Sequence, residues 1–156
     1  ISDWMSAANI RYVHVESEDG NCNTTNLNVV FDVRPIDVRG KYLARAFYPS
    51  MPREKRSLVV DKSAWSSQTI SLVGVMRHEL GHTLGFRHEH TRPEAGKCFE
   101  DSNWDSLTEY DSASVMHYPQ CQGTGNWGTM ALTANDRLGV ALAYGLPKPA
   151  EEGSQQ

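Results

Sequence analysis

The spacing of apolar residues along the first part of the chain predicts one short helix followed by strands. Residues 1–9 have helical spacing, whereas apolar and polar side chains alternate over residues 10–15 in the manner of a half-buried strand. Apolar segments rich in Val, Leu and Phe, separated by proline and glycine, predict further strands over residues 27–36, 41–50 and 56–61. At least four strands are therefore expected before the first long helix.

The first long helix is expected over residues 70–84. Apolar side chains recur along it at helical spacing and form a stripe through Ile70, Val73, Leu80 and Leu84. The stretch WSSQT just before it offers a serine or threonine as N-terminal cap, and Gly85 allows the chain to leave the helix. Four of the six histidines of the chain lie in this helix or shortly after it.

The remainder of the chain is irregular until a closing helix. Residues 87–130 show little periodicity and are rich in Gly, Pro, Asn and Ser, so this part is expected to be mostly loop. Residues 132–145 regain helical spacing, with Thr133 as the cap and with Leu138 and Leu142 facing the core.

Length and composition indicate one globular domain. The chain has 156 residues, of which 39% are hydrophobic and 22% charged, and we expect a single domain over residues 1–147 and a flexible tail over 148–156. The formal net charge of −4, without a basic stripe, argues against binding to nucleic acid. No apolar run approaches the roughly 20 residues that cross a bilayer. A chain that begins at Ile1 indicates a processed or trimmed form.

The three cysteines, Cys22, Cys98 and Cys121, lack the C-x-x-C spacing of zinc clamps and redox sites. One disulfide and one leftover thiol is the simplest arrangement, and it favours an oxidising, secreted setting. Cys98 and Cys121 lie in polar, turn-rich stretches, and a bond between them would contribute on the order of 3 kcal/mol by closing a loop. Two alternatives stay open: three small buried thiols, or a Cys22 that pairs with a segment outside this sequence.

The histidines in and after the first long helix have the spacing of a catalytic zinc site. His78 and His82 are four residues apart, so on a helix both can reach one ion at roughly 2.0–2.1 Å. Gly85 permits a positive φ, which would bring His88 to the same ion. Three protein ligands leave a position for water, whereas structural zinc sites are closed by four. Glu79 would lie beside that water and take its proton, which is the chemistry of peptide hydrolysis.

Other interpretations of the same residues are weighed against this one. A histidine pair four residues apart also occurs on solvated helix faces that bind no metal. A zinc-binding module or inactive homologue would recognise peptides without cutting them, and the intact Glu79 disfavours it. An aminopeptidase with HExxH would need an acidic residue to capture a free amine and usually has glutamate as third ligand, which His88 disfavours.

From His78 to His88 the chain matches every fixed position of HExxHxxGxxH, and through this motif it resembles the metzincins, a class of zinc metalloendopeptidases. The longer stretch HELGHTLGFRHEHTRPE resembles the astacin branch. Downstream, SVMHYP resembles the Met-turn of this class, with Met116 as its methionine and Tyr118 as the tyrosine found in astacins.

The resemblance extends over nearly the whole chain. KYLARAFYP followed by SLVVDKSAW resembles the edge strand and the following strand of matrixins, and LTANDRLGVALAYG resembles the closing helix of several metzincins. Its short length and few cysteines depart from animal astacins. In these respects the chain is more similar to compact bacterial relatives of the dual-action HEIGH metallopeptidase type.

The resemblance implies an α+β metzincin fold. Its sheet would be twisted and mostly parallel, with four to five strands and an antiparallel edge strand, beside a long active-site helix and a C-terminal helix. A cleft would separate an upper part over residues 1–85 from a lower part over 86–147. An extended substrate would pair with an edge strand formed by Leu43, Ala44, Arg45, Ala46 and Phe47. The loop from Gln120 to Met130 would line the side-chain pockets.

The resemblance also implies roles for residues around the zinc. Met116 would form a hydrophobic base below the ion, and Tyr118 would bind zinc at rest and then donate a hydrogen bond to the oxyanion. Glu89 would make a water-linked contact with the mature N-terminus. Ordinary core, aromatic and solvated roles are the alternatives for these three residues. At Gly74 and Gly81 we expect close packing against the closing helix or the Met-turn, with a tolerated helix imperfection as the alternative.

The predicted function is therefore a secreted, zinc-dependent endopeptidase with one Zn2+ ion, a metal-activated water and Glu79 as general base. Its expected partners are protein or peptide substrates and an inhibitory prosegment; a monomer is expected, without nucleic acid or membrane. His90 and His117 lie next to matched positions, so we expect them outside the ligand set. Asp136 either anchors the Met-turn or serves only as a helix-start acid.

Overall fold

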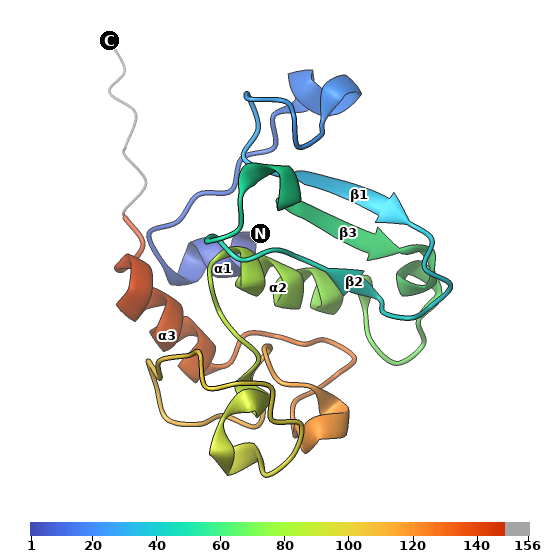
Figure 1. The fold of residues 1–156 in the computed structure, drawn as a ribbon. Coiled ribbons are helices and arrows are strands. Elements are labelled where there is room, and N and C mark those ends of the chain that lie inside the picture. Colours follow the sequence, from blue (N-terminus) through green and yellow to red (C-terminus); the bar gives the residue numbers. More distant parts are fainter. Residues whose placement is uncertain (149–156) are drawn as a thin grey trace.

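The computed structural model describes residues 1–148. A sheet lies over one long helix, and loops and a closing helix lie on the other side of that helix (Figure 1). In chain order the helices and strands are α1 Ser2–Ala7, β1 Asp32–Ile36, β2 Ala44–Arg45, β3 Ser57–Asp61, α2 Leu72–Thr83 and α3 Ala134–Tyr144. The predicted tail over 148–156 falls almost wholly outside the described residues. Across residues 1–148, no helix combines the length and apolarity needed to cross a bilayer.

The sheet has the order β1-β3-β2. β1 runs parallel to β3, and β2 lies antiparallel to β3 at the opposite edge. This mixed pairing, with helices packed beside the sheet, agrees with the α+β class expected from the sequence. Within residues 1–148, however, the sheet has three strands and not four to five.

Residues 10–15 form no strand, and within them Tyr12 contacts α2. Val13 and Val15 are exposed, whereas Tyr12 is half-buried and its hydroxyl donates to the carbonyl oxygen of Leu80 at 3.1 Å. Of the apolar side chains of this segment, Ile10 and Tyr12 pack against the core. The alternation does not mark a ladder of strand hydrogen bonds.

α2 begins two residues later than predicted, because Ser71 and not WSSQT provides its cap: the Ser71 hydroxyl accepts from the Gly74 amide at 3.0 Å. Val73 is 58% exposed, so its predicted place in the buried stripe is wrong. The buried residues of the helix are Gly74, Val75, His78, Glu79, Leu80, Gly81 and His82. Because the sheet and the Met116 segment enclose α2 from two sides, its polar site residues are buried together with its apolar ones.

The closing helix α3 starts at the predicted cap, where Thr133 forms a capping box. Leu138 and Leu142 are 51% and 59% exposed, so the prediction that they face the core is wrong. α3 packs on α1 and on the loop of Leu107 and Thr108, and Gly139 and Val140 are its buried residues.

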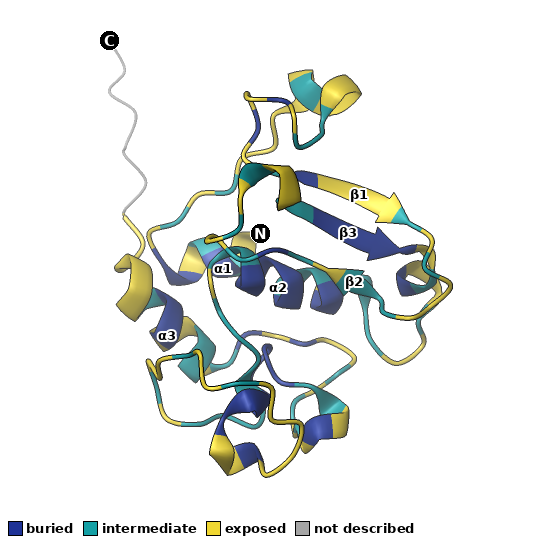
Figure 2. Ribbon diagram, viewed as in Figure 1, coloured by how far each residue is buried: buried dark blue, intermediate teal, exposed yellow. Residues whose placement is uncertain are grey.

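Trp4 joins α1 to the main core. It is 1% exposed, its Nε1 donates to the carbonyl oxygen of Arg77 at 2.9 Å, and its ring stacks on Phe86 with centroids 5.6 Å apart. Figure 2 shows that buried residues concentrate on β3 and along α2. The core includes Leu58, Val60, Leu80, Val115 and Met116.

Two glycines of α2 are closely packed, as the sequence suggested. A Cβ at Gly81 would overlap the sulfur of Met116, so the Met-turn segment packs directly on this glycine. A Cβ at Gly74 would lie 2.9 Å from the Cβ of Met130. The neighbour at Gly74 is thus the loop before α3, and neither the closing helix nor the Met-turn.

Alanine at Gly74 is expected to destabilise the fold by about 1–3 kcal/mol, because Met130 Cβ cannot move away without its backbone. At Gly139 in α3 a new Cβ would meet its nearest neighbour at 3.8 Å. There the same substitution is expected to stabilise the fold by about 0.5–1 kcal/mol through helix propensity. Denaturant unfolding of both variants beside the wild type tests the pair. If the alanine at Gly74 also stabilises the fold, the close contact with Met130 costs no free energy of folding, and the prediction is wrong.

Candidate metal centre

The Nε2 atoms of three histidines converge on one point. His82 Nε2 lies 3.2 Å from His78 Nε2 and 3.1 Å from His88 Nε2. Three ligands of a tetrahedral zinc ion at 2.0–2.1 Å would lie about 3.3 Å from one another, so the spacing fits such an ion. α2 supplies the first two histidines, and Gly85, with a φ of 96°, turns the chain so that His88 joins them. The structure therefore brings together the three residues that the motif predicts as ligands.

Backbone carbonyl groups orient the two histidines of α2. His78 Nδ1 donates to the carbonyl oxygen of Val115 at 2.7 Å, and His82 Nδ1 donates to that of Phe86 at 2.8 Å. A carbonyl oxygen only accepts, so the ring proton lies on Nδ1 and each Nε2 presents a lone pair to the centre.

A carboxylate orients His88, whose Nδ1 donates to Glu100 Oε1 at 2.7 Å. Burial lowers the pKa of all three rings, that of His78 well below its usual value and that of His88 to about 3. Three neutral rings with their lone pairs turned inward repel one another unless a cation lies between them. The donor set of three imidazole nitrogens fits a borderline-soft divalent ion such as Zn2+.

Glu79 lies beside the three histidines, next to β2. It is 7% exposed, and burial raises its pKa to about 7 against the opposing influence of the Ala46 amide and the Arg45 guanidinium. Glu79 lines a cavity of about 300 Å³ whose other walls include Leu43, Ala44, Ile70, Tyr118, Gln120 and Met130. This cavity lies between the sheet edge and the loop over residues 120–130, to which the sequence assigned the side-chain pockets.

Tyr118 packs its ring against the histidines. Its ring centroid lies 4.4 Å from that of His88 and 5.4 Å from that of His78, and burial raises the pKa of its hydroxyl to about 12. Met116 is 4% exposed and is buried against Gly81 of α2. Both residues of the predicted Met-turn therefore adjoin the helix that carries the histidines.

Asp136 fixes the Met-turn segment. Its carboxylate accepts from the Ser114 hydroxyl at 2.6 Å and from the Val115 amide at 3.0 Å, and it also accepts from the Thr133 amide at 2.9 Å. The two roles weighed for Asp136 are thus combined, because one carboxylate caps α3 and anchors the Met-turn. Since the Val115 carbonyl orients His78, this anchor extends to the metal site.

The predicted edge strand is shorter than expected. Only Ala44 and Arg45 pair with β3, while the carbonyl oxygen of Leu43 accepts from the Asp61 amide at 2.8 Å. Phe47 is 4% exposed and its side chain belongs to the interior. β2 is an edge of the sheet within residues 1–148, so its outer side has no strand neighbour there.

Glu89 is held inside the protein. It accepts from the Asp111 amide at 2.9 Å and lies 3.3 Å from the Arg92 guanidinium, and burial raises its pKa to about 7. In the part of the chain that the structure describes, no ion pair joins Glu89 to the amino group of Ile1, a residue that is 56% exposed. The expected water-linked contact between Glu89 and the mature N-terminus stays a prediction.

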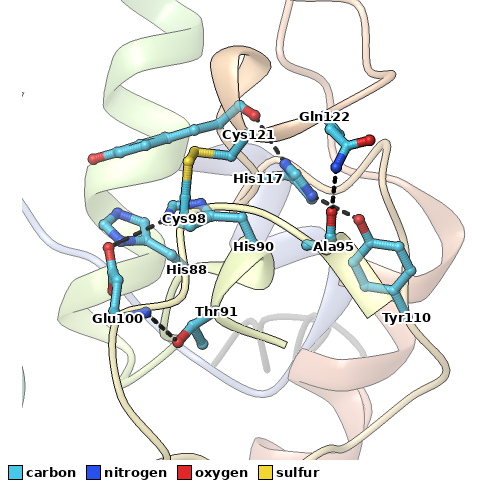
Figure 3. The surroundings of a disulfide bond; sticks show 11 residues. His88, His90, Thr91, Ala95, Cys98, Glu100, Tyr110, His117, Cys121 and Gln122 are labelled. Carbon is cyan, nitrogen blue, oxygen red and sulfur yellow. Dashed lines mark hydrogen bonds and ion pairs between the residues drawn. A yellow bond between two sulfur atoms is a disulfide. The ribbon is translucent and has the colours of Figure 1, made fainter. Parts of the chain in front are cut away.

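Cys98 and Cys121 form the predicted disulfide, and Cys22 has no partner among the described residues. Sequence reasoning missed Glu100, which lies beside this disulfide and accepts from two histidines (Figure 3). No periodicity or motif marks Glu100, because it follows His88 by 12 residues within an irregular loop.

The arrangement around the three histidines is that of the metzincin class of metalloproteases, as the motif indicated. Residues 1–95 match the matrixin family of peptidases, and the chain belongs to that family.

Relatives of the chain include several astacin-like proteinases. The bone morphogenetic protein 1 homolog of Strongylocentrotus purpuratus is 35% identical over 101 residues, which covers 51% of this chain and 16% of that protein. The astacin-like metalloendopeptidase of Gallus gallus is 34% identical over 101 residues, which covers 42% of this chain and 24% of that protein. Zinc metalloproteinase nas-30 of Caenorhabditis elegans is 30% identical over 82 residues, which covers 40% of this chain and 11% of that protein. The chain thus spans less than a quarter of the length of these three relatives.

Among solved structures, myroilysin is similar with a TM-score of 0.48 and 19% identity, over 76% of this chain and 73% of that chain. The expected kinship with metzincins and with astacin-like proteinases is confirmed by the family and the relatives. The narrower likeness to compact bacterial relatives stays a prediction.

Proposed function

We propose that this chain is a zinc-dependent endopeptidase. His78, His82 and His88 would hold one Zn2+ ion, and Tyr118 would be a further, displaceable ligand. When bound, zinc lowers the pKa of a water molecule and polarises the carbonyl group to be cleaved. The observation that carries the proposal is the convergence of three Nε2 atoms, each directed inward by an acceptor at Nδ1.

Glu79 is the general base. It follows the first histidine on α2 and lines the cavity that adjoins the sheet edge, so its carboxylate is within reach of both a central water and a bound peptide. It takes the proton of the attacking water and passes it to the leaving amine. The Tyr118 hydroxyl then donates a hydrogen bond to the oxyanion that develops on the substrate. Met116 supports the site from the interior.

The substrate binds as an extended peptide beside β2. Edge strands offer unpaired amide and carbonyl groups to such a peptide, and pockets in the protein then select among the side chains of the peptide. The backbone positions assigned to this edge are Leu43, Ala44, Arg45, Ala46 and Phe47. Apolar side chains form part of the adjoining cavity wall, including those of Ile70, Val75 and Met130. The cavity therefore favours a substrate with an apolar residue beside the cleaved bond.

The setting proposed for the enzyme is extracellular. A disulfide in the described residues supports secretion, because such bonds persist in oxidising compartments. An inhibitory prosegment and a monomeric catalytic domain complete the proposal. Residues 1–85 and 86–147 form the upper and lower parts of that domain, on the two sides of the cleft.

The products of cleavage test this function. The purified protein is expected to hold about one zinc ion per chain and to cut unfolded casein at internal bonds. Metal analysis measures the zinc content, and mass spectrometry of the fragments identifies the bonds that are cut. Fragments shortened stepwise from their N-termini would indicate an aminopeptidase. A zinc-loaded protein that cuts no unfolded substrate would instead support a peptide-binding module.

A further inference from the structure

One carboxylate oxygen connects two histidines at the edge of the metal site. Glu100 Oε1 accepts from His88 Nδ1 at 2.7 Å and lies 3.2 Å from His90 Nε2 (Figure 3). The side chain of His90 is 2% exposed and that of Glu100 is 35% exposed. Glu100 is therefore held from the protein side by two rings, while its other side reaches solvent.

His88 depends on such a partner more than the other two histidines do. His78 and His82 project from a helix, and each donates to a neutral backbone carbonyl group. His88 follows the helix, in an extended conformation with φ −62° and ψ 132°, so no helical neighbours restrict its ring. A carboxylate at Nδ1 fixes the ring rotation and makes Nε2 a stronger donor toward a metal.

We propose that Glu100 is a positioning residue for His88, and that the Cys98–Cys121 disulfide holds Glu100 in place. The inference rests on the proposed zinc site. It assigns the disulfide a part in metal binding as well as in stability.

The disulfide fixes the chain close to Glu100. Cys98 precedes Glu100 by two residues, and Cys121 follows Tyr118 by three, so the bond joins the loop of Glu100 to the segment that borders the site. The backbone of Cys98 has a φ of 59°, in the left-handed region that favours glycine. A residue keeps such a conformation only where its surroundings impose it.

Thr91 holds the other end of this loop. Its hydroxyl oxygen lies 3.3 Å from the amides of both Glu100 and Asp101, and it donates to the Asp101 carbonyl oxygen at 3.0 Å. Thr91 is 1% exposed and lies in the same short turn as His90. The loop is therefore fixed on both sides of the carboxylate, by a covalent bond before it and by hydrogen bonds at and after it.

Glu100→Gln tests the proposal by measuring metal affinity. The amide keeps the shape of the side chain but removes its charge, so the zinc dissociation constant is expected to rise about 10–100-fold. Competition with a chromogenic zinc chelator gives this constant without any assay of activity. The visible absorption of the Co2+-substituted protein, which reports ligand geometry, is expected to shift in the same variant. Glu100→Asp keeps the charge but is one methylene shorter, and we expect it to lose affinity as well.

Asp101→Asn is the matched control. It removes a carboxylate from the neighbouring position, where the side chain pairs with Arg87 at 2.5 Å and reaches no metal ligand. Wild-type zinc affinity and an unchanged cobalt spectrum are expected for this variant. If Asp101→Asn lowers the zinc affinity as much as Glu100→Gln does, the proposal is overturned, because a general loss of negative charge would then explain both results.

The disulfide is tested by the double variant Cys98→Ser/Cys121→Ser. Its zinc affinity is expected to fall, and adding Glu100→Gln is expected to lower the affinity little further, since both changes act through one carboxylate. If the fold-losses of zinc affinity caused by the cysteine changes and by Glu100→Gln multiply in the combined variant, the link between the disulfide and Glu100 is refuted. Unaltered zinc affinity in Glu100→Gln would refute the positioning role itself.

Metal stoichiometry separates the remaining outcomes. Two zinc ions in the wild type and one in Glu100→Gln would replace the positioning role with a second metal site at His88, His90 and Glu100, and so overturn the proposal. A wild type that binds no zinc would instead refute the proposed function on which the inference rests. Normal zinc binding with an unaffected Glu100→Gln would leave that function intact and remove only the inference.

Discussion

Glu79→Gln is expected to lower kcat/KM for peptide cleavage by about 10²–10⁴-fold and to leave the zinc content unchanged. The amide has the shape of the carboxylate but cannot take the proton of the attacking water. Glu79 lies outside the set of three converging nitrogens, so the ligands keep their positions. The cavity beside it also keeps its volume.

Cleavage of a fluorogenic peptide, with zinc measured in the same preparations, gives both quantities for this variant. Glu54→Gln is the matched control, because it makes the same change at an exposed residue in the connection before β3. Full activity in a zinc-loaded Glu79→Gln variant would contradict the role of Glu79. Loss of zinc together with activity would show that the substitution acts on the metal site.

Tyr118→Phe is expected to lower kcat by about 10²–10³-fold, with a much smaller change in KM. The hydroxyl is proposed to bond the oxyanion, which exists only as the reaction proceeds, so its loss weakens the transition state more than the bound substrate. The ring itself stays packed against His88 and His78, because phenylalanine keeps the aromatic contacts.

Steady-state kinetics on the same peptide separate these two effects. Tyr144→Phe serves as control, since it removes a hydroxyl that donates to the Leu84 carbonyl oxygen at 2.6 Å, away from the three histidines. A rise in KM at constant kcat in Tyr118→Phe would assign the hydroxyl to substrate binding. Unchanged kinetics would leave Tyr118 as a packing residue only.

The convergence of the three histidines could be predicted from sequence because it follows from local geometry. A spacing of four residues on a helix places His78 and His82 on the same face. Gly85, with its positive φ, turns the chain after the helix and so brings His88 to the same place. The Cys98–Cys121 pairing could be predicted from the polar surroundings of these two cysteines. Each of these inferences uses a few neighbouring residues or a small number of alternatives.

The parts that sequence did not predict depend on contacts between distant segments. Tyr12 belongs to an alternating segment, but its contact with Leu80 on α2 replaces strand pairing. Leu138 and Leu142 have helical spacing, yet the buried side of α3 is formed by Gly139 and Val140 instead. The acceptor atoms around the metal site are two backbone carbonyl groups and one loop carboxylate, and no residue pattern reveals which of them meets which ring.

The carboxylate of Asp136 has a consequence for the order in which the protein matures. All three histidines have been synthesised by residue 88, but the Met-turn segment that orients His78 is anchored by a residue 48 positions later. A growing chain on the ribosome therefore carries the histidines well before it can hold them in their final orientation. The centre is completed only when the closing helix has emerged, which makes assembly of the metal site one of the last events in the synthesis of this domain.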